Sequence, residues 1–225
     1  MTADLELRMY RDMFPANARL DLPLKAAHRI VYCFEGDVIL LSDKALATDV
    51  GLYAKSAMPV SAGAAGAEIW RWELAETSAE VSLATGTRVR SELLISGPLL
   101  TVETEIDDEG WLMRLDSVAF PAGGCAFKHT HRGPGIRCLV AGDIRIDAEG
   151  ASHAFGVGEP WFEAGPDSVF AQAGNQPTRF VRVSVLPACL AGQSSIKYVN
   201  PEDQAQPKDQ SYRGYIDQAI GMLTR

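Results

Sequence analysis

The sequence predicts an all-β protein, and three observations support this fold class. Short runs rich in Val, Ile, Leu and aromatic residues recur along most of the chain, and each is bounded by Gly, Pro, Asp or Asn, the residues of tight turns. No segment before residue 195 shows a convincing helical period. One stretch of the chain is also repeated, which indicates that the same β unit occurs twice.

Five segments carry the strand signal most clearly. They are RIVYCFEGDVILL from Arg29, AEIWRWELAE from Ala67, WLMRLDSVAF from Trp111, GIRCLVAGDIRID from Gly135 and TRFVRVSVLP from Thr178. Their β-branched and aromatic residues fit a pleated, half-buried surface better than a helix.

The repeat begins at Phe14 and again at Phe120. FPANARLDLPLKAAHRIVYCFEGDVIL and FPAGGCAFKHTHRGPGIRCLVAGDIRI align without a gap and share Phe-Pro-Ala, an isoleucine and Gly-Asp. Inserting two residues extends the match, so that Arg71 falls on Arg179. The repeat therefore predicts two tandem β units.

The unit boundary is expected in the acidic turn TEIDDEG, residues 104–110. This divides the chain into a first unit at 1–107, a second at 108–190 and a C-terminal arm at 191–225. In the arm, NPEDQAQPKDQS is polar with two prolines and predicts a loop. A short amphipathic helix is predicted after it, because apolar residues there have helical spacing: Tyr212, Tyr215, Ile216, Ala219, Ile220 and Leu223. We expect this helix to cover one barrel or to contact a second subunit.

Composition narrows the class of protein. The net charge of -8 and pI near 5.0 provide no basic stripe for nucleic acid. The N-terminus carries charges throughout, unlike a signal peptide, and no apolar run is long enough for a bilayer. The four cysteines lack paired spacing, which favours reduced thiols and a cytoplasmic protein: Cys33, Cys125, Cys138 and Cys189.

The second unit resembles the cupin superfamily, whose first motif reads G-x5-H-x-H-x3,4-E-x6-G. Gly123, His129, His131 and Gly142 match its framework, and residues 163–175 resemble the second motif. The resemblance covers nearly the whole chain. It implies a bicupin, with two tandem jelly-roll β-barrels.

Two of the family's four metal ligands are missing. The glutamate position falls on Gly135, and the second-motif histidine falls on or near Val169. In the first unit, Pro23 and Lys25 stand at the His-x-His positions. We therefore expect no metal in the first unit, whose role would be structural.

The His pair is the strongest candidate site. Residues two apart on a strand point to one face, so His129 and His131 could reach one divalent ion at about 2.0–2.2 Å. The family's glutamate position implies that Arg137 shares the barrel interior, where a buried guanidinium needs an anionic partner. We assign His129, His131 and Arg137 as catalytic residues and Arg137 as a substrate-binding residue.

A third metal ligand is needed, because stable sites offer three or more. Glu163 is the first choice, and Asp167 and His153 are alternatives. Trp161 and Phe162 flank the pocket and could form its wall or pack in the core. The sequence does not distinguish Zn, Fe, Mn or Ni, and a metal-free barrel, in which the two histidines bond a ligand or one another, stays open.

Three functions follow from these residues. The first is a cupin-type enzyme acting on a small carboxylated or oxygenated molecule, with metal assistance, as a lyase, isomerase, decarboxylase or oxygenase. The second is a non-catalytic module that binds or senses a small acid, and the third is a degenerate structural cupin. The expected partners are an anionic small molecule and a second copy of the chain. We expect no nucleotide cofactor, nucleic acid or membrane, since Gly133-Pro134-Gly135 lacks the Lys-Ser/Thr and helix of a phosphate loop.

Overall fold

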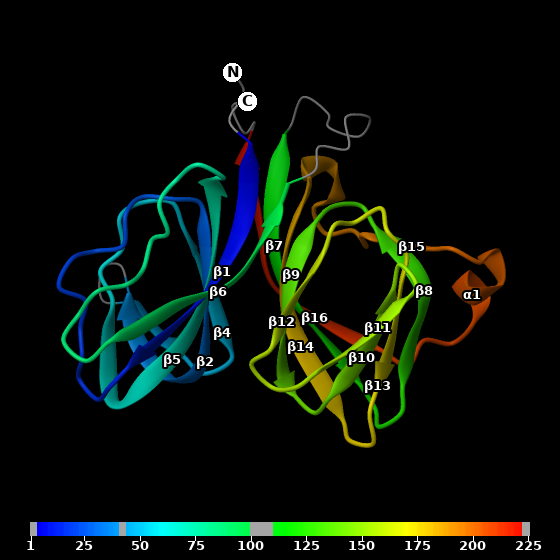
Figure 1. Ribbon diagram of the computed structural model, residues 1–225, viewed down its shortest axis with the longest axis horizontal. Helices are drawn as coiled ribbons and strands as arrows, with labels where there is room; N and C mark the ends of the chain where they lie inside the picture. Colours follow the sequence, from blue (N-terminus) through cyan, green and yellow to red (C-terminus); the bar gives the residue numbers. More distant parts are fainter. Residues whose placement is uncertain (1–3, 41–43, 100–109, 222–225) are drawn as a thin grey trace. The chain divides into compact units, whose positions relative to one another are not determined.

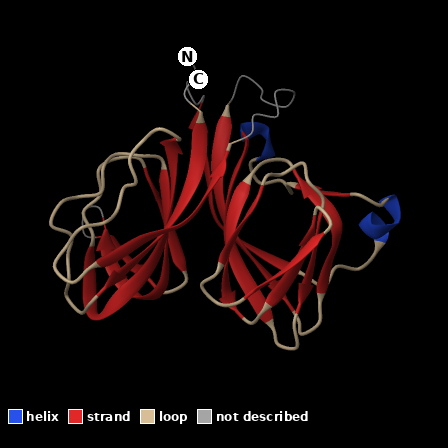
Figure 2. Cartoon of the chain, viewed as in Figure 1, coloured by secondary structure: helices blue, strands red, loops and turns tan. Residues whose placement is uncertain are grey.

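The all-β prediction is confirmed. In the computed structural model, nearly all of the regular secondary structure is antiparallel strand (Figure 2). The structure describes residues 4–40, 44–99 and 110–221. The chain divides into two compact units, residues 1–98 and 99–224. Residues 104–109 of the acidic turn, where the sequence predicted a boundary, lie outside the described residues.

Within its described residues, the N-terminal unit forms one six-stranded sheet. Its strands are β1 Leu5–Phe14, β2 Arg29–Leu40, β3 Lys44–Ala47, β4 Val50–Ala54, β5 Ser61–Glu76 and β6 Arg90–Pro98. The order is β3-β2-β5-β1-β6, with β4 paired to β2. Alternate residues of β2, such as Val31 and Cys33, point into the core of this unit. Leu24 and Met58, which form an isolated β-bridge, also belong to this core.

The C-terminal unit is a sandwich of two five-stranded sheets (Figure 1). Its strands are β7 Trp111–Phe120, β8 Cys125–His131, β9 Gly135–Ala141, β10 Ile144–Ala148, β11 Ala151–Phe155, β12 Pro160–Glu163, β13 Val169–Ala173, β14 Thr178–Pro187, β15 Ile196–Tyr198 and β16 Ser211–Gly221. One sheet has the order β12-β9-β14-β7-β16 and the other β11-β10-β13-β8-β15. A 3-10 turn at Ala188–Leu190 and helix α1, Pro201–Ala205, connect the last strands.

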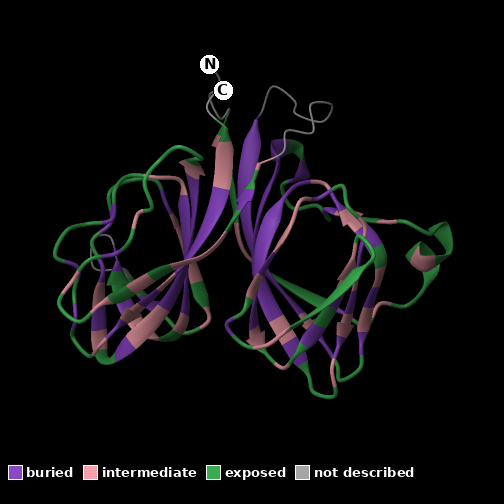
Figure 3. Cartoon of the chain, viewed as in Figure 1, coloured by how far each residue is buried: buried purple, intermediate pink, exposed green. Residues whose placement is uncertain are grey.

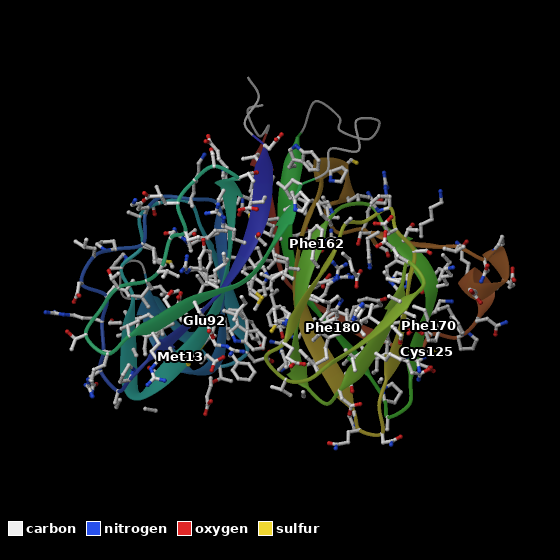
Figure 4. The ribbon with its side chains drawn as sticks, in the orientation of Figure 1. Met13, Glu92, Cys125, Phe162, Phe170 and Phe180 are labelled. Atoms are coloured by element: carbon white, nitrogen blue, oxygen red, sulfur yellow. The ribbon has the colours of Figure 1, made fainter. Side chains whose placement is uncertain are left out.

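An apolar core fills one end of this sandwich. Both sheets contribute to it, through Val118, Phe120, Ala126, Leu139, Ile144, Ile146, Trp161, Ala171, Ala173 and Phe180. Phe180 is labelled in Figure 4, and β7 and β14 are buried along nearly their whole length in Figure 3. Because strand residues alternate between faces, Arg182 follows Phe180 onto the interior face of β14, and Asp116 precedes Val118 on that of β7.

The predicted C-terminal helix is wrong. Residues 211–221 form strand β16, which pairs with the edge of β7, and residues 222–225 lie outside the described part of the chain. Two register shifts, between Gly214 and Ile216 and between Ala219 and Gly221, interrupt the alternation of faces. These bulges space the apolar residues three or four apart, which imitates a helix. The short helix α1 lies instead in the stretch predicted as a loop, and no helix of the described chain is long and apolar enough to cross a membrane.

The strand registers show the internal repeat directly. In the N-terminal unit, β1 pairs with β5 so that Tyr10 lies opposite Arg71, and in the C-terminal unit β7 pairs with β14 so that Asp116 lies opposite Arg182. The equivalent of Arg71 is therefore Arg182, and the predicted match to Arg179 is wrong. The insertion between the two copies is longer than the two residues that the sequence indicated, because loops change length where no ladder constrains them.

Candidate functional site

Two neighbouring strands of one sheet place arginines in the interior of the C-terminal unit. Arg137 of β9 lies directly opposite Arg182 of β14, and Trp161 of β12 lies opposite Arg137 on its other side. His129 and His131 come from β8 in the facing sheet. All five side chains are buried, with exposed fractions of 7% or less. The predicted convergence of the two imidazoles with the Arg137 guanidinium inside this unit is what the structure shows.

The two histidines contact one another through their Nε2 atoms, which lie 3.2 Å apart. His129 Nδ1 lies 2.7 Å from the carbonyl oxygen of Phe127, and because a carbonyl only accepts, Nδ1 carries the hydrogen. The Nε2 atom of His129 then presents a lone pair to His131. Burial lowers the pKa of both imidazoles, that of His131 to about 3, so both are neutral near pH 7.

Glu163, at the end of β12, links His131 to Arg137. Its Oε2 lies 2.7 Å from Arg137 Nη2 and 3.1 Å from His131 Nε2, and its Oε1 accepts a hydrogen bond of 2.8 Å from Trp161 Nε1. Burial by itself would raise the pKa of the Glu163 carboxyl. The Arg137 charge and the hydrogen bonds instead hold this pKa below its ordinary value, so the group is a carboxylate.

Arg182 and Asp116 form a second buried ion pair, which the sequence reading missed. Arg182 donates from Nε and Nη2 to the two carboxylate oxygens, at 2.6 and 3.0 Å. The signal was present, because Arg182 shares the interior parity of Phe180 on its strand. These residues and the four above form one buried group, here called the histidine cluster: His129, His131, Arg137, Glu163, Asp116 and Arg182.

Two cavities adjoin the histidine cluster. The inner one has about 20 Å³, room for about one water molecule, and both histidines, Arg137 and Glu163 line it. The larger one, about 590 Å³, is lined by Arg114, Asp116, Arg182, Gly192, Gln193, Ser194, Ser195, Tyr212, Gly214, Tyr215, Ile216 and Asp217. Arg182 and Tyr212 line both cavities, so a molecule in the larger one would reach the edge of the cluster through them.

Of the two residues predicted to form the pocket wall, Trp161 and Phe162, only Trp161 lines a cavity beside the histidine cluster. Trp161 lines the inner cavity and stacks on Phe155 with ring centroids 4.9 Å apart. Phe162, next along β12, lies on the opposite face of the sheet and lines neither cavity, and its role as a substrate contact stays a prediction. The alternative metal ligands His153 and Asp167 are exposed, and neither lines these cavities.

The two substituted motif positions are explained by strand pairing. Gly135, at the family's glutamate position, lies directly opposite Glu163, so a carboxylate is supplied from the neighbouring strand instead. Val169, at the histidine position, lies opposite His129 and offers no ligand atom. The sequence does not reveal this replacement, because Gly135 and Glu163 are far apart in the chain and meet only through the pairing of β9 with β12.

Solved structures share this architecture, whereas known sequences do not match it. No family model and no curated protein sequence matches the chain. Among solved structures, the formate complex of Lactobacillus farciminis oxalate decarboxylase has a TM-score of 0.61 at 13% identity, covering 92% of this chain and 82% of that one. Bacillus subtilis oxalate decarboxylase, with its Mn(II) centres, has 0.60 at 11% identity, covering 89% and 73%. AerE from Microcystis aeruginosa has 0.58 at 13% identity, covering 81% and 93%.

The chain shares the all-β fold of these solved structures, and the likeness to the two oxalate decarboxylases extends over most of its length. At such low identity the likeness extends to the fold alone, and the resemblance to cupins makes a divalent metal in the C-terminal unit the first property to test against the residues.

The histidine cluster does not fit a divalent ion in this arrangement. Within the described ranges, no group of three or more His, Cys, Asp or Glu side chains could hold one. The two histidines are spaced like a ligand pair, but the Glu163 oxygen nearest to them is engaged by Arg137. The charges of the cluster already balance, because two guanidinium groups face two carboxylates and both imidazoles are neutral. An added divalent ion would leave two positive charges uncompensated in the interior of the unit.

Proposed function

We propose that the C-terminal unit of this cupin-type protein binds a small carboxylated or oxygenated organic molecule in the larger cavity. The observation that carries the proposal is the Arg182 side chain. Its Nε and Nη2 bond Asp116, and the side chain also lines the cavity. A guanidinium N–H facing a cavity favours an acceptor oxygen from a ligand.

The rest of the cavity wall supports an oxygenated ligand. The Ser195 hydroxyl is buried without a hydrogen-bond partner among the described residues, although it lines the same cavity. An unsatisfied buried hydroxyl is costly, so a ligand oxygen there would restore a lost hydrogen bond. Tyr212 and Ile216 add apolar surface, and the volume of about 590 Å³ lies within the usual range for small-molecule sites.

The ligand class agrees with what two structural neighbours are named for. Oxalate is a small dicarboxylate, and one neighbouring decarboxylase holds formate. These enzymes share the fold and little sequence, so the proposal stands on the cavity of this chain. The sequence predicted that Arg137 binds the substrate, but Arg137 forms an ion pair with Glu163. In this proposal Arg182 binds the ligand instead.

An enzyme acting on the same class of molecule is the second candidate. The observation that favours it is the neutral histidine pair, whose inner cavity shares Arg182 and Tyr212 with the larger one. A neutral imidazole can accept a proton from a bound molecule. Proton NMR of candidate ligands incubated with wild-type protein and with His129→Ala separates the two candidates, because only an enzyme converts the ligand, and only with His129 present.

The binding proposal is tested by calorimetric titration with a panel of small mono- and dicarboxylates and their neutral amides. Ser195→Ala removes the unpartnered hydroxyl, and Ser152→Ala, on the exposed strand β11, is the matched control. We expect Ser195→Ala to weaken binding about tenfold, the loss of one hydrogen bond of about 1.4 kcal/mol, without lowering the melting temperature. A panel in which nothing binds, or a hit whose affinity Ser195→Ala leaves unchanged, contradicts the proposed site.

A further inference from the structure

We propose that the Arg137 guanidinium occupies the electrostatic role of a divalent cation in the C-terminal unit. Removing its charge would then turn His129, His131 and Glu163 into a working metal site. This inference is independent of the ligand proposed for the larger cavity, because it concerns only the inner cavity and the groups around it.

Two of the three pairs of ligand atoms are already separated by nearly the distance that a metal site requires. His129 Nε2 and His131 Nε2 lie 3.2 Å apart, and His131 Nε2 lies 3.1 Å from Glu163 Oε2. Ligand atoms about 2.1 Å from a tetrahedral zinc ion are roughly 3.4 Å apart, so only small shifts are needed. His129 also has the tautomer of a metal ligand, since its Nδ1–H donates a hydrogen bond to the Phe127 carbonyl and its Nε2 therefore carries no hydrogen.

Arg137 is what prevents the ion from binding. Its Nη2 lies 2.7 Å from the same Glu163 oxygen that would complete the ligand set, and the side chain is 1% exposed, so it cannot withdraw its charge into water. A divalent ion beside it would meet strong repulsion in a low-dielectric interior. Arg182, the other positive charge, is already balanced by Asp116.

Gly135, which stands at the glutamate position of the motif, contacts both Arg137 and the neighbouring strand β14. Arg137 Nη1 donates a hydrogen bond of 2.6 Å to the Gly135 carbonyl, which holds the guanidinium against its own strand. A Cβ at position 135 would lie 3.1 Å from Arg137 Nη1, 2.8 Å from Ser184 Oγ and 2.7 Å from the Val183 carbonyl oxygen. A Cβ at 135 would collide first with the Val183 carbonyl oxygen of β14, so no carboxylate can stand at this position of the strand, and Glu163 on the paired strand β12 is the carboxylate beside the histidines.

The test compares zinc binding by the untagged full chain and its variants. Arg137→Met keeps the apolar stem without the charge, and Arg145→Met is the control, because Arg145 is an exposed arginine on β10, the next strand along the chain. After chelation and dialysis, Zn²⁺ is titrated calorimetrically, and Co²⁺ absorbance reports coordination. We expect Arg137→Met to bind one equivalent of Zn²⁺ at least tenfold more tightly than the wild type and Arg145→Met, and the added change His129→Ala to abolish the gain.

Two results overturn the inference. The first is a wild-type chain that binds one equivalent of Zn²⁺ as tightly as Arg137→Met and loses it on His129→Ala. The second is a folded Arg137→Met protein, verified by circular dichroism, with no gain in binding. If Arg137→Met does not fold, Arg137→Gln retains a donor for the Gly135 carbonyl while removing the charge, and the wild-type titration alone still decides the first result.

Discussion

Replacing Glu163 by Gln tests whether the histidine cluster depends on its carboxylate charge. The change preserves size and leaves an amide oxygen to accept the Trp161 Nε1 hydrogen bond, while it removes the negative charge 2.7 Å from Arg137. Arg137 is then a buried cation without a counter-ion. The same substitution at Glu159, an exposed residue of the preceding turn, provides the control.

The magnitude follows from the burial of the pair. Breaking a buried ion pair by removing one partner costs about 3–5 kcal/mol. The Arg137 and Glu163 side chains are 1% and 9% exposed, and the inner cavity can admit about one water, so we expect a loss at the lower end, about 3 kcal/mol. The control Glu159→Gln should change stability by about 0.5 kcal/mol or less.

The assay is urea unfolding at pH 7, followed by circular dichroism, for the wild type, the single variants and the double variant Glu163→Gln/Arg137→Met. Removing both charges should recover most of the loss, because no buried charge is then left unpaired. A loss below about 1 kcal/mol for Glu163→Gln, or a double variant as unstable as the sum of the two singles, would refute the reasoning.

Three further predictions concern other parts of the chain. Asp116→Asn leaves Arg182 without its carboxylate and should lower the free energy of unfolding by about 3–5 kcal/mol, measured by the same urea titration; a loss below about 1 kcal/mol contradicts the buried pair. Iodoacetamide at pH 8 should modify the exposed Cys189 first and spare Cys33, whose pKa burial raises to about 11; mass spectrometry of timed samples checks this, and equal rates would be unexpected. Truncation after Gln210 removes β16 and bares the edge of β7, so size-exclusion chromatography should show association or aggregation, whereas an unchanged elution volume and melting temperature contradict the role of β16.

The fold was predictable because its signals are local. Tight-turn residues bounded each strand, and the repeat at Phe14 and Phe120 indicated two units without any contact information. The helix prediction at 211–225 failed because two bulges interrupt the alternation of β16, and a bulge is set by the partner strand.

The site was predictable as far as parity on one strand extends. His129, His131 and Arg137 were placed inside from two-residue spacing and the motif framework, and Glu163 was chosen as their acidic partner. The roles within the cluster depend on contacts across ladders. Arg182 and Asp116 lie far apart in sequence and meet only through the pairing of β14 with β7, so no local pattern could reveal that Arg137 is committed or that Arg182 faces the larger cavity.

Nitrogen-15 NMR of the histidine side chains, between pH 8 and pH 5, tests most directly whether the cluster is a closed and charge-balanced unit. Since burial lowers the pKa of His131 to about 3, the His131 ring should stay neutral across this range, and the hydrogen of His129 should lie on Nδ1 at pH 8. Burial also lowers the pKa of His129, so both folded imidazoles bind protons at lower pH than the unfolded chain, and stability should fall as the pH drops below about 6.5. An imidazolium signal from His131 between pH 8 and pH 5 contradicts the account.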